Sequence, residues 1–118
     1  MAEKVKLYGL PYCDATQGVT KWLEQKGYEI NLHNYKTDGI TVDKLEEWSK
    51  KLGWEKLLNK RSTTWRSLSK LKQDAVVDAA SAVVAMQQNT SLIKRPVIEF
   101  GKELLLGFDE KKLSNTFK

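Results

Sequence analysis

The first 35 residues follow a strand, helix, strand order, and this order constrains the fold more than any other feature of the chain. Apolar and polar residues alternate from Val5 to Leu10, as in a strand, and Pro11-Tyr12 then interrupts the pattern. From Asp14 the apolar residues follow helical spacing as far as Gly27, and alternation returns from Tyr28 to Tyr35. A strand–helix–strand unit of this kind makes two parallel strands joined by a right-handed crossover.

The middle of the chain, residues 37 to 92, is predicted to be helical. Thr41 is a natural N-cap, and Gly53 is expected to end the helix that begins there. One further helical turn is expected over residues 54–58, followed by an irregular basic segment over 59–69 and a second long helix over 73–88. The residues expected to face inward from that helix are Val76, Ala79, Ala80, Val83 and Met86.

The C-terminal part returns to strands. Two apolar runs, 97–100 and 104–107, flank Gly101-Lys102, which indicates a tight hairpin, and Asp109 is expected to cap a final short helix. The strand–helix–strand and strand–strand–helix segments therefore predict an α/β fold with one four-stranded mixed sheet. The 118 residues are expected to form a single domain, with its core in 1–36 and 93–118 and a helical insertion over 37–92.

Composition excludes several classes of protein. With one cysteine and one histidine, the chain cannot form an internal disulfide or a zinc site built on several thiolates, and no metal site is predicted. No apolar run is long enough to span a membrane, and none follows the N-terminus as in a signal peptide, so we expect a cytoplasmic protein.

The positive charge of the chain is concentrated in one segment. The net charge is +5, but residues 50–72 contain eight Lys or Arg and one acid, Glu55, which gives this segment +7. Such a segment could bind nucleic acid, an acidic protein or a small anion, or it could be the solvated face of helices.

The single cysteine, Cys13, lies where the first predicted strand passes into the first predicted helix. Ligands bind at the carboxyl ends of parallel strands, and the N–H groups of Asp14, Ala15 and Thr16 would face the sulfur at the helix start. This environment stabilises a thiolate, although the charge of Asp14 opposes it. The alternative is a small buried residue that only fills the corner between strand and helix.

Two arginines could complete an anion site beside this cysteine. Arg95 precedes Pro96 at the start of the third predicted strand, where an X–Pro bond can be cis, and Arg61 lies in the basic segment. Guanidinium groups near a thiolate lower its pKa and bind oxyanions or carboxylates. The sequence alone leaves open whether these are ordinary surface arginines.

At four places the residues resemble the ArsC/Spx family, most closely its YffB-type branch. The segments that carry the resemblance, in order along nearly the whole chain, are Tyr8-Gly9-Leu10-Pro11-Tyr12-Cys13-Asp14, Asn59-Lys60-Arg61 with Thr63-Thr64-Trp65, Leu92-Ile93-Lys94-Arg95-Pro96-Val97, and Gly107-Phe108-Asp109. The resemblance implies a thioredoxin-like fold with an inserted helical subdomain. It also implies that Cys13 is the nucleophile, that Arg61 and Arg95 bind the anion, and that Pro96 is a cis-proline facing the cysteine.

Two departures from the family pattern affect the expected function. Glutaredoxin-dependent arsenate reductases carry a third active-site arginine after the last strand pair, and Gly107-Phe108-Asp109 contains none. Spx-type regulators often carry a Cys-x-x-Cys switch, and Thr16 occupies its fourth position here.

These features predict a glutathione-dependent thiol reductase with no tightly bound cofactor. Because the chain has no second cysteine, the resolving thiol must come from glutathione or glutaredoxin, and the substrate is expected to be a small anion or a thiol compound. The alternative is an Spx-like regulatory module that binds a protein partner such as RNA polymerase without catalysis. Nucleic acid and membranes are not expected partners. Trp65, within the basic segment, is expected to be partly exposed.

Overall fold

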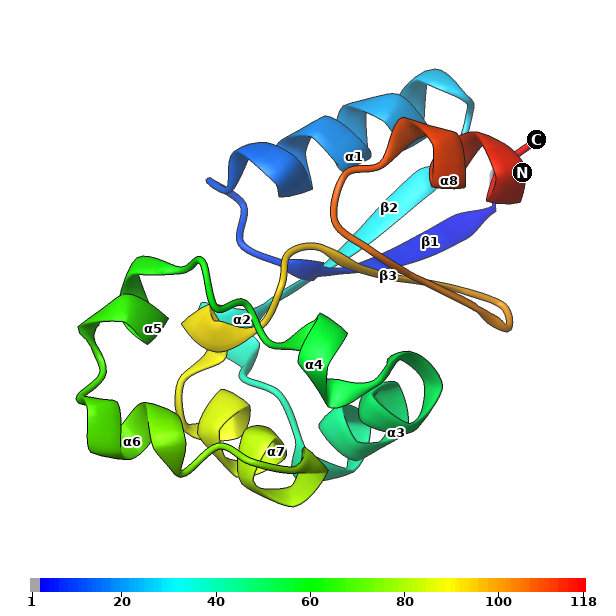
Figure 1. The fold of residues 1–118 in the computed structure, drawn as a ribbon. Helices are drawn as coiled ribbons and strands as arrows, with labels where there is room; N and C mark the ends of the chain where they lie inside the picture. Colours follow the sequence, from blue (N-terminus) through cyan, green and yellow to red (C-terminus); the bar gives the residue numbers. More distant parts are fainter. Residues whose placement is uncertain (1–2) are drawn as a thin grey trace. The chain divides into compact units, whose positions relative to one another are not determined.

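The computed structural model describes residues 3–118, and Figure 1 shows its helices and strands along the chain. In order, these are β1 (Lys4–Gly9), α1 (Asp14–Gln25), β2 (Glu29–Asn34), α2 (Tyr35–Asp38), α3 (Val42–Leu52), α4 (Trp54–Leu57), α5 (Thr63–Ser67), α6 (Lys70–Asp74), α7 (Ala79–Gln88), the 3-10 turn η1 (Thr90–Leu92), β3 (Val97–Phe100), β4 (Glu103–Leu106) and α8 (Glu110–Thr116). None of the helices in this part of the chain is long and apolar enough to cross a membrane.

The four strands form one mixed sheet in the order β2-β1-β3-β4. β1 and β2 are parallel, joined through α1, whereas β3 runs antiparallel to β1 and to β4. The turn between β3 and β4 contains Gly101 with a positive φ of 59°, a conformation that glycine adopts without strain. The predicted α/β class, with its four-stranded mixed sheet, is therefore confirmed.

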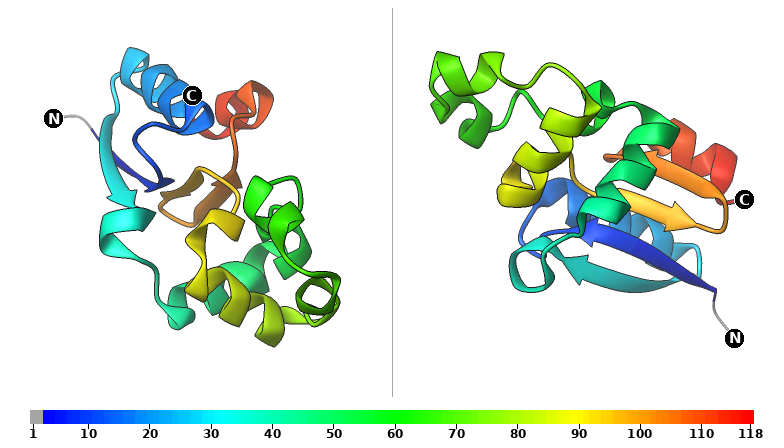
Figure 2. Two further views of the ribbon diagram at one scale, coloured as in Figure 1. Left: turned by 90° about the vertical axis from the view of Figure 1, so that its left-hand side faces the viewer. Right: turned by 90° about the horizontal axis from the view of Figure 1, so that it is seen from below.

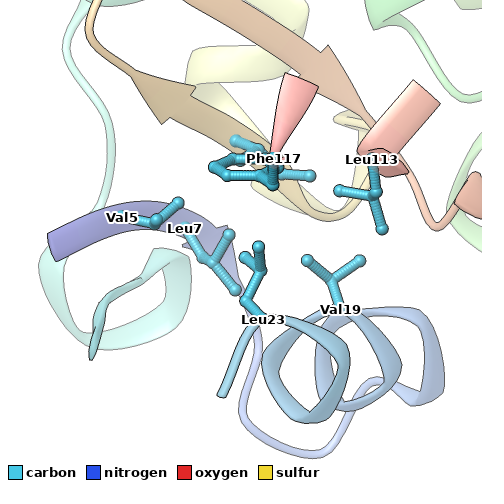
Figure 3. Packing of buried hydrophobic residues seen from close by; sticks show 7 residues of the cluster. Val5, Leu7, Val19, Leu23, Leu113 and Phe117 are labelled. Carbon is cyan, nitrogen blue, oxygen red and sulfur yellow. The ribbon is translucent and has the colours of Figure 1, made fainter. Parts of the chain in front are cut away.

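The chain divides into two compact units. The first, which we call the sheet unit, comprises residues 3–38 and 95–118, and the second, the helical unit, comprises residues 39–94. In the sheet unit, α1 and α8 cover one face of the sheet (Figures 1 and 2). The buried residues of this face are Val5, Leu7, Val19, Leu23, Ile98, Leu113 and Phe117. Figure 3 labels all of them except Ile98 and shows several of the labelled side chains pointing toward one another.

The helical unit is built around the packing of α3 on α7. Leu45 and Trp48 of α3 and Val83 and Met86 of α7 are all buried. α3 begins at Thr41, whose side chain accepts a hydrogen bond from the Lys44 N–H, as predicted for an N-cap. A short antiparallel bridge joins Leu58, directly after α4, to Ile93, near the C-terminal end of the unit.

The structure corrects the sequence prediction for residues 59–88. Residues 63–67 form α5 instead of an irregular segment, because the Ser62 side chain caps this helix by accepting a hydrogen bond from the Trp65 N–H. Trp65 itself is 9% exposed, so the expectation of a partly exposed ring was wrong.

The helix expected over 73–88 is two helices, α6 and α7. Asp78 and Ser81 form a capping box that starts α7 anew, and this resets which residues face inward. Ala82, Val83 and Met86 are buried, whereas Ala79 and Ala80, which the continuous helix would have buried, are exposed.

Candidate functional site

Cys13 is the N-cap residue of α1, directly after the turn that follows β1. Its own N–H donates to the Leu10 carbonyl at 3.1 Å, and the Gln17 side chain donates to the Pro11 carbonyl at 2.8 Å, so the turn is fixed from both ends. With φ −81° and ψ 127°, Cys13 has the extended backbone typical of an N-cap residue, and its side chain is partly exposed. The sequence prediction for its location is therefore confirmed.

Several donors surround the sulfur of Cys13. Burial has the largest single effect on this thiol and raises its pKa, but hydrogen bonds from the Thr16 N–H, the Thr16 hydroxyl, the Arg95 side chain and the Ala15 N–H act in the opposite direction. Together the donors prevail, so the pKa of Cys13 is lowered from the ordinary value of a thiol.

Thr16 is the residue of this site whose contribution the sequence analysis missed. Its side chain is 1% exposed and acts on the Cys13 thiol, whose pKa it lowers. This contribution could have been expected from the sequence, because Thr16 is the third residue of α1 and a residue at that position lies beside the N-cap side chain. Thr16 thus replaces the second thiol of a Cys-x-x-Cys pattern with a hydrogen-bond donor.

Gly9, the last residue of β1, keeps the Thr16 hydroxyl in place. A Cβ atom at Gly9 would lie 2.6 Å from Thr16 Oγ1, closer than real side chains approach. Any larger residue at Gly9 must therefore displace the hydroxyl that faces the sulfur.

Arg95 and Pro96 lie directly before β3. The Arg95–Pro96 peptide is cis, as the resemblance implied, and the Pro96 carbonyl accepts a hydrogen bond from the Gly107 N–H at 2.8 Å. The half-buried Arg95 side chain hydrogen-bonds to Cys13, so the structure brings this predicted arginine to the sulfur.

Arg61 belongs to the helical unit, where it is exposed in the turn before α5. The Asn59 side chain accepts a hydrogen bond from the Arg61 N–H at 3.1 Å, and this fixes the backbone of the turn. Within the same unit, Lys60, Arg61 and Lys94 line a cavity of about 400 Å³ together with Glu55 and Asn59. The role of Arg61 at the thiol stays a prediction.

Phe108 occupies the segment where the third arginine of arsenate reductases is expected. Its ring packs on Gly18 of α1 so closely that a Cβ atom at Gly18 would lie 2.7 Å from two ring carbons. The ring is nevertheless 43% exposed. An exposed aromatic ring, not a cation, therefore lies against the second turn of α1.

A buried polar cluster lies on the strands and α2 of the sheet unit. The Tyr8 hydroxyl donates to Glu99 at 2.8 Å, and the Tyr8 ring lies 4.8 Å from the ring of His33 and 6.4 Å from that of Tyr35. Burial raises the pKa of Tyr35 far above its ordinary value, with smaller effects of Tyr8, Arg95 and Glu99. The ring of His33, the single histidine of the sequence, packs against the rings of Tyr8 and Tyr35 in this cluster.

Comparison with known proteins identifies the family. A profile of the ArsC family matches residues 8–116. The chain belongs to the ArsC family. The four segments that carried the resemblance all overlap the matched range, so the predicted family is confirmed.

Three members or relatives of the ArsC family show how far the likeness extends. The solved structure of a protein named YFFB has a TM-score of 0.91 and is 33% identical, covering 97% of this chain and 99% of that one. An arsenate reductase related protein from Brucella melitensis has a TM-score of 0.76 and is 36% identical, covering 100% and 98%. The global transcriptional regulator Spx of Staphylococcus haemolyticus is 23% identical over 92% of this chain and 83% of its own. The thioredoxin-like fold is shared with these ArsC structures.

Proposed function

We propose that this protein is a glutathione-dependent thiol reductase that uses Cys13 as its nucleophile. The observation that carries the proposal is the set of four donors that lowers the pKa of Cys13 at the start of α1. The thiolate, not the thiol, attacks disulfides, so these donors increase the reactive fraction near neutral pH. Membership of the ArsC family and the likeness to an arsenate reductase related protein support a role of this kind.

The proposed reaction is a pair of thiol–disulfide exchanges on a glutathione mixed disulfide. The Cys13 thiolate attacks the glutathionyl sulfur, the substrate leaves as a thiolate that takes up a proton, and Cys13 becomes glutathionylated. A second glutathione thiolate then attacks the same glutathionyl sulfur, releasing glutathione disulfide and the Cys13 thiolate. Two electrons pass from glutathione to the substrate, and the external thiol does the work of the second cysteine that this chain lacks.

Arsenate is expected to be a poor substrate. Arg95 and the N–H groups of α1 can hold an oxyanion, but the segment after β4 offers the ring of Phe108 and no guanidinium. One missing charged hydrogen bond, at about 1.5–3 kcal/mol, lowers the rate roughly 10- to 100-fold.

Mass spectrometry after incubation with glutathione disulfide tests the proposal. We expect the wild type to gain one glutathione, Cys13→Ser to gain none, and added reduced glutathione to remove the adduct. Arg95→Gln is expected to gain the adduct more slowly, while Lys102→Gln, in the hairpin turn, serves as the matched control. A wild-type protein that stays unmodified contradicts the proposal.

The likeness to Spx supports a second candidate, a regulatory module that binds a protein and does not catalyse. That function requires no reactive thiol, so it predicts a Cys13 that neither glutathionylates nor alkylates below pH 8. The donors around the sulfur favour the reductase.

A further inference from the structure

Helix α7 has an unusual composition for a helix with an open face. Its ten residues, Ala79–Gln88, include no charged side chain. Ala82, Val83 and Met86 are buried on one side, but Val84 on another side is 51% exposed. A helix that is neutral and largely apolar around its circumference is normally covered on every side.

Three exposed apolar residues of the helical unit lie in or close to α6 and α7 along the chain. Among the described residues six large hydrophobic side chains are exposed, and three of them lie between positions 71 and 84: Leu71 (83% exposed), Val77 (69%) and Val84 (51%). Single exposed hydrophobic residues are ordinary, whereas a gathering in one short stretch of chain indicates a binding surface. α6, which carries Leu71, has no buried residue at all.

A groove of about 740 Å³ runs between α6 and α7, and its walls are mostly apolar. Leu68, Val76, Val84 and Leu92 contribute to these walls, together with alanines such as Ala80. Because none of its lining residues lies in a strand, the groove offers no strand edge with which an extended peptide could pair. A helix, whose backbone groups are already paired, suits such a groove through side chains at positions i, i+3, i+4 and i+7.

The charge of the groove restricts its occupant. Lys72 is the one charged residue that lines it, and no carboxylate among residues 3–118 pairs with Lys72 or with Arg66 of the neighbouring α5. The nearby acids are already engaged, since Asp74 pairs with Lys70 at 3.5 Å and Asp78 caps α7. A second copy of this chain would bring a second Lys72 against the first, which is repulsive.

We propose that the groove between α6 and α7 binds an amphipathic helix of a protein partner, with apolar anchors on one face and acidic residues beside them. The anchors fill the apolar walls over the length of α7, about 15 Å for ten residues. The acidic residues pair with Lys72, the charged residue that lines the groove. This surface lies within the helical unit and does not depend on the reaction of Cys13.

Titration of the full-length, isotopically labelled protein with two designed peptides tests the proposal by NMR. Both peptides are 15-residue helices with leucines at i, i+3, i+4 and i+7, and one has glutamates beside the leucines where the other has lysines. We expect the glutamate peptide to shift the amide signals of Ala75, Ala80 and Val84, and the lysine peptide to bind at least tenfold more weakly. The difference should shrink as salt is added.

Variants locate the binding and its charge preference. Lys72→Glu is expected to reverse the preference toward the lysine peptide, and Val84→Glu to weaken the glutamate peptide at least tenfold. Val42→Glu is the matched control, because Val42 is a 39% exposed valine of the same unit that does not line the groove. Equal binding of both peptides, shifts confined to residues outside 68–92, or the absence of any shift overturns the proposal. Dimerisation that Val84→Glu abolishes also overturns it, because the occupant is then a second copy.

Discussion

Replacing Thr16 with valine should make Cys13 less acidic while leaving the fold intact. Valine has the shape of threonine without the hydroxyl, and that hydroxyl has no oxygen or nitrogen partner to lose in the described structure. A hydrogen bond to a charged group contributes about 1.5–3 kcal/mol when buried, and the partial exposure of the sulfur reduces this to about 0.7–1.4 kcal/mol. The thiolate fraction of Thr16→Val should therefore be roughly three- to tenfold lower at a pH well below the midpoint.

Thiolate absorbance near 240 nm as a function of pH measures this directly, because only the ionised sulfur absorbs strongly there. Cys13→Ser provides the blank, and Thr20→Val is the matched control, since the Thr20 hydroxyl donates to the Thr16 carbonyl and not to the sulfur. A midpoint for Thr16→Val equal to that of the wild type would refute the role assigned to the hydroxyl.

The same substitution should change the stability of the protein in a way that depends on pH. Folding lowers the pKa of Cys13, so the thiolate stabilises the native state fully only above the pH at which the unfolded thiol ionises, and this contribution is lost as the pH falls through the folded pKa. Thr16→Val should therefore lose more stability relative to the wild type at a pH above 9, where the unfolded thiol is ionised, than at an acidic pH below the folded pKa, as measured by urea unfolding. A loss of stability that is equal at both pH values contradicts the assignment.

Three further predictions concern the residues that support the site. Gly9→Ala should raise the midpoint of the Cys13 titration by displacing the Thr16 hydroxyl, and should have no further effect in the Thr16→Val background. Gly18→Ala, made in the Phe108→Ala background, should raise the free energy of unfolding by about 1 kcal/mol, because alanine favours the helix more than glycine does. The same change in the wild type should give a smaller gain, because the Phe108 ring leaves no space for the added methyl group. Equal gains in the two backgrounds, measured by urea unfolding, would refute the contact between Gly18 and Phe108. Phe117→Ala should lose about 3–5 kcal/mol in the same assay, because this ring is 0% exposed and packs on Tyr28 and Phe100; a loss below 1 kcal/mol refutes its place in the core.

The sequence predicted the sheet well because its signals are local. The alternation in β1 and β2, the hairpin glycine at 101 and the capping residues Thr41 and Asp109 each act within a few residues. The helical unit was predicted less well, because the side-chain caps at Ser62 and at Asp78 with Ser81 overrode a continuous apolar periodicity. Two caps therefore converted one expected helix and one expected loop into α5, α6 and α7.

The site shows the same division between local and distant signals. The position of Cys13 at the start of α1 follows from the order of neighbouring elements, so the sequence could predict it. The burial of the Thr16 hydroxyl against Gly9 and the packing of Phe108 on Gly18 each depend on how two elements meet, and no residue spacing encodes that. The approach of Arg95 to the sulfur, across more than 80 residues of chain, could be expected only from the family resemblance.

The rate of Cys13 alkylation as a function of pH, measured on the folded protein and on the same protein in concentrated urea, tests the central claim most directly. We predict that the folded protein reaches half its maximal rate at a lower pH than the unfolded chain, and that prior incubation with glutathione disulfide blocks the reaction. A folded midpoint equal to or above that of the unfolded chain would contradict the account, because the donors around the sulfur would then leave Cys13 no more acidic than an ordinary thiol.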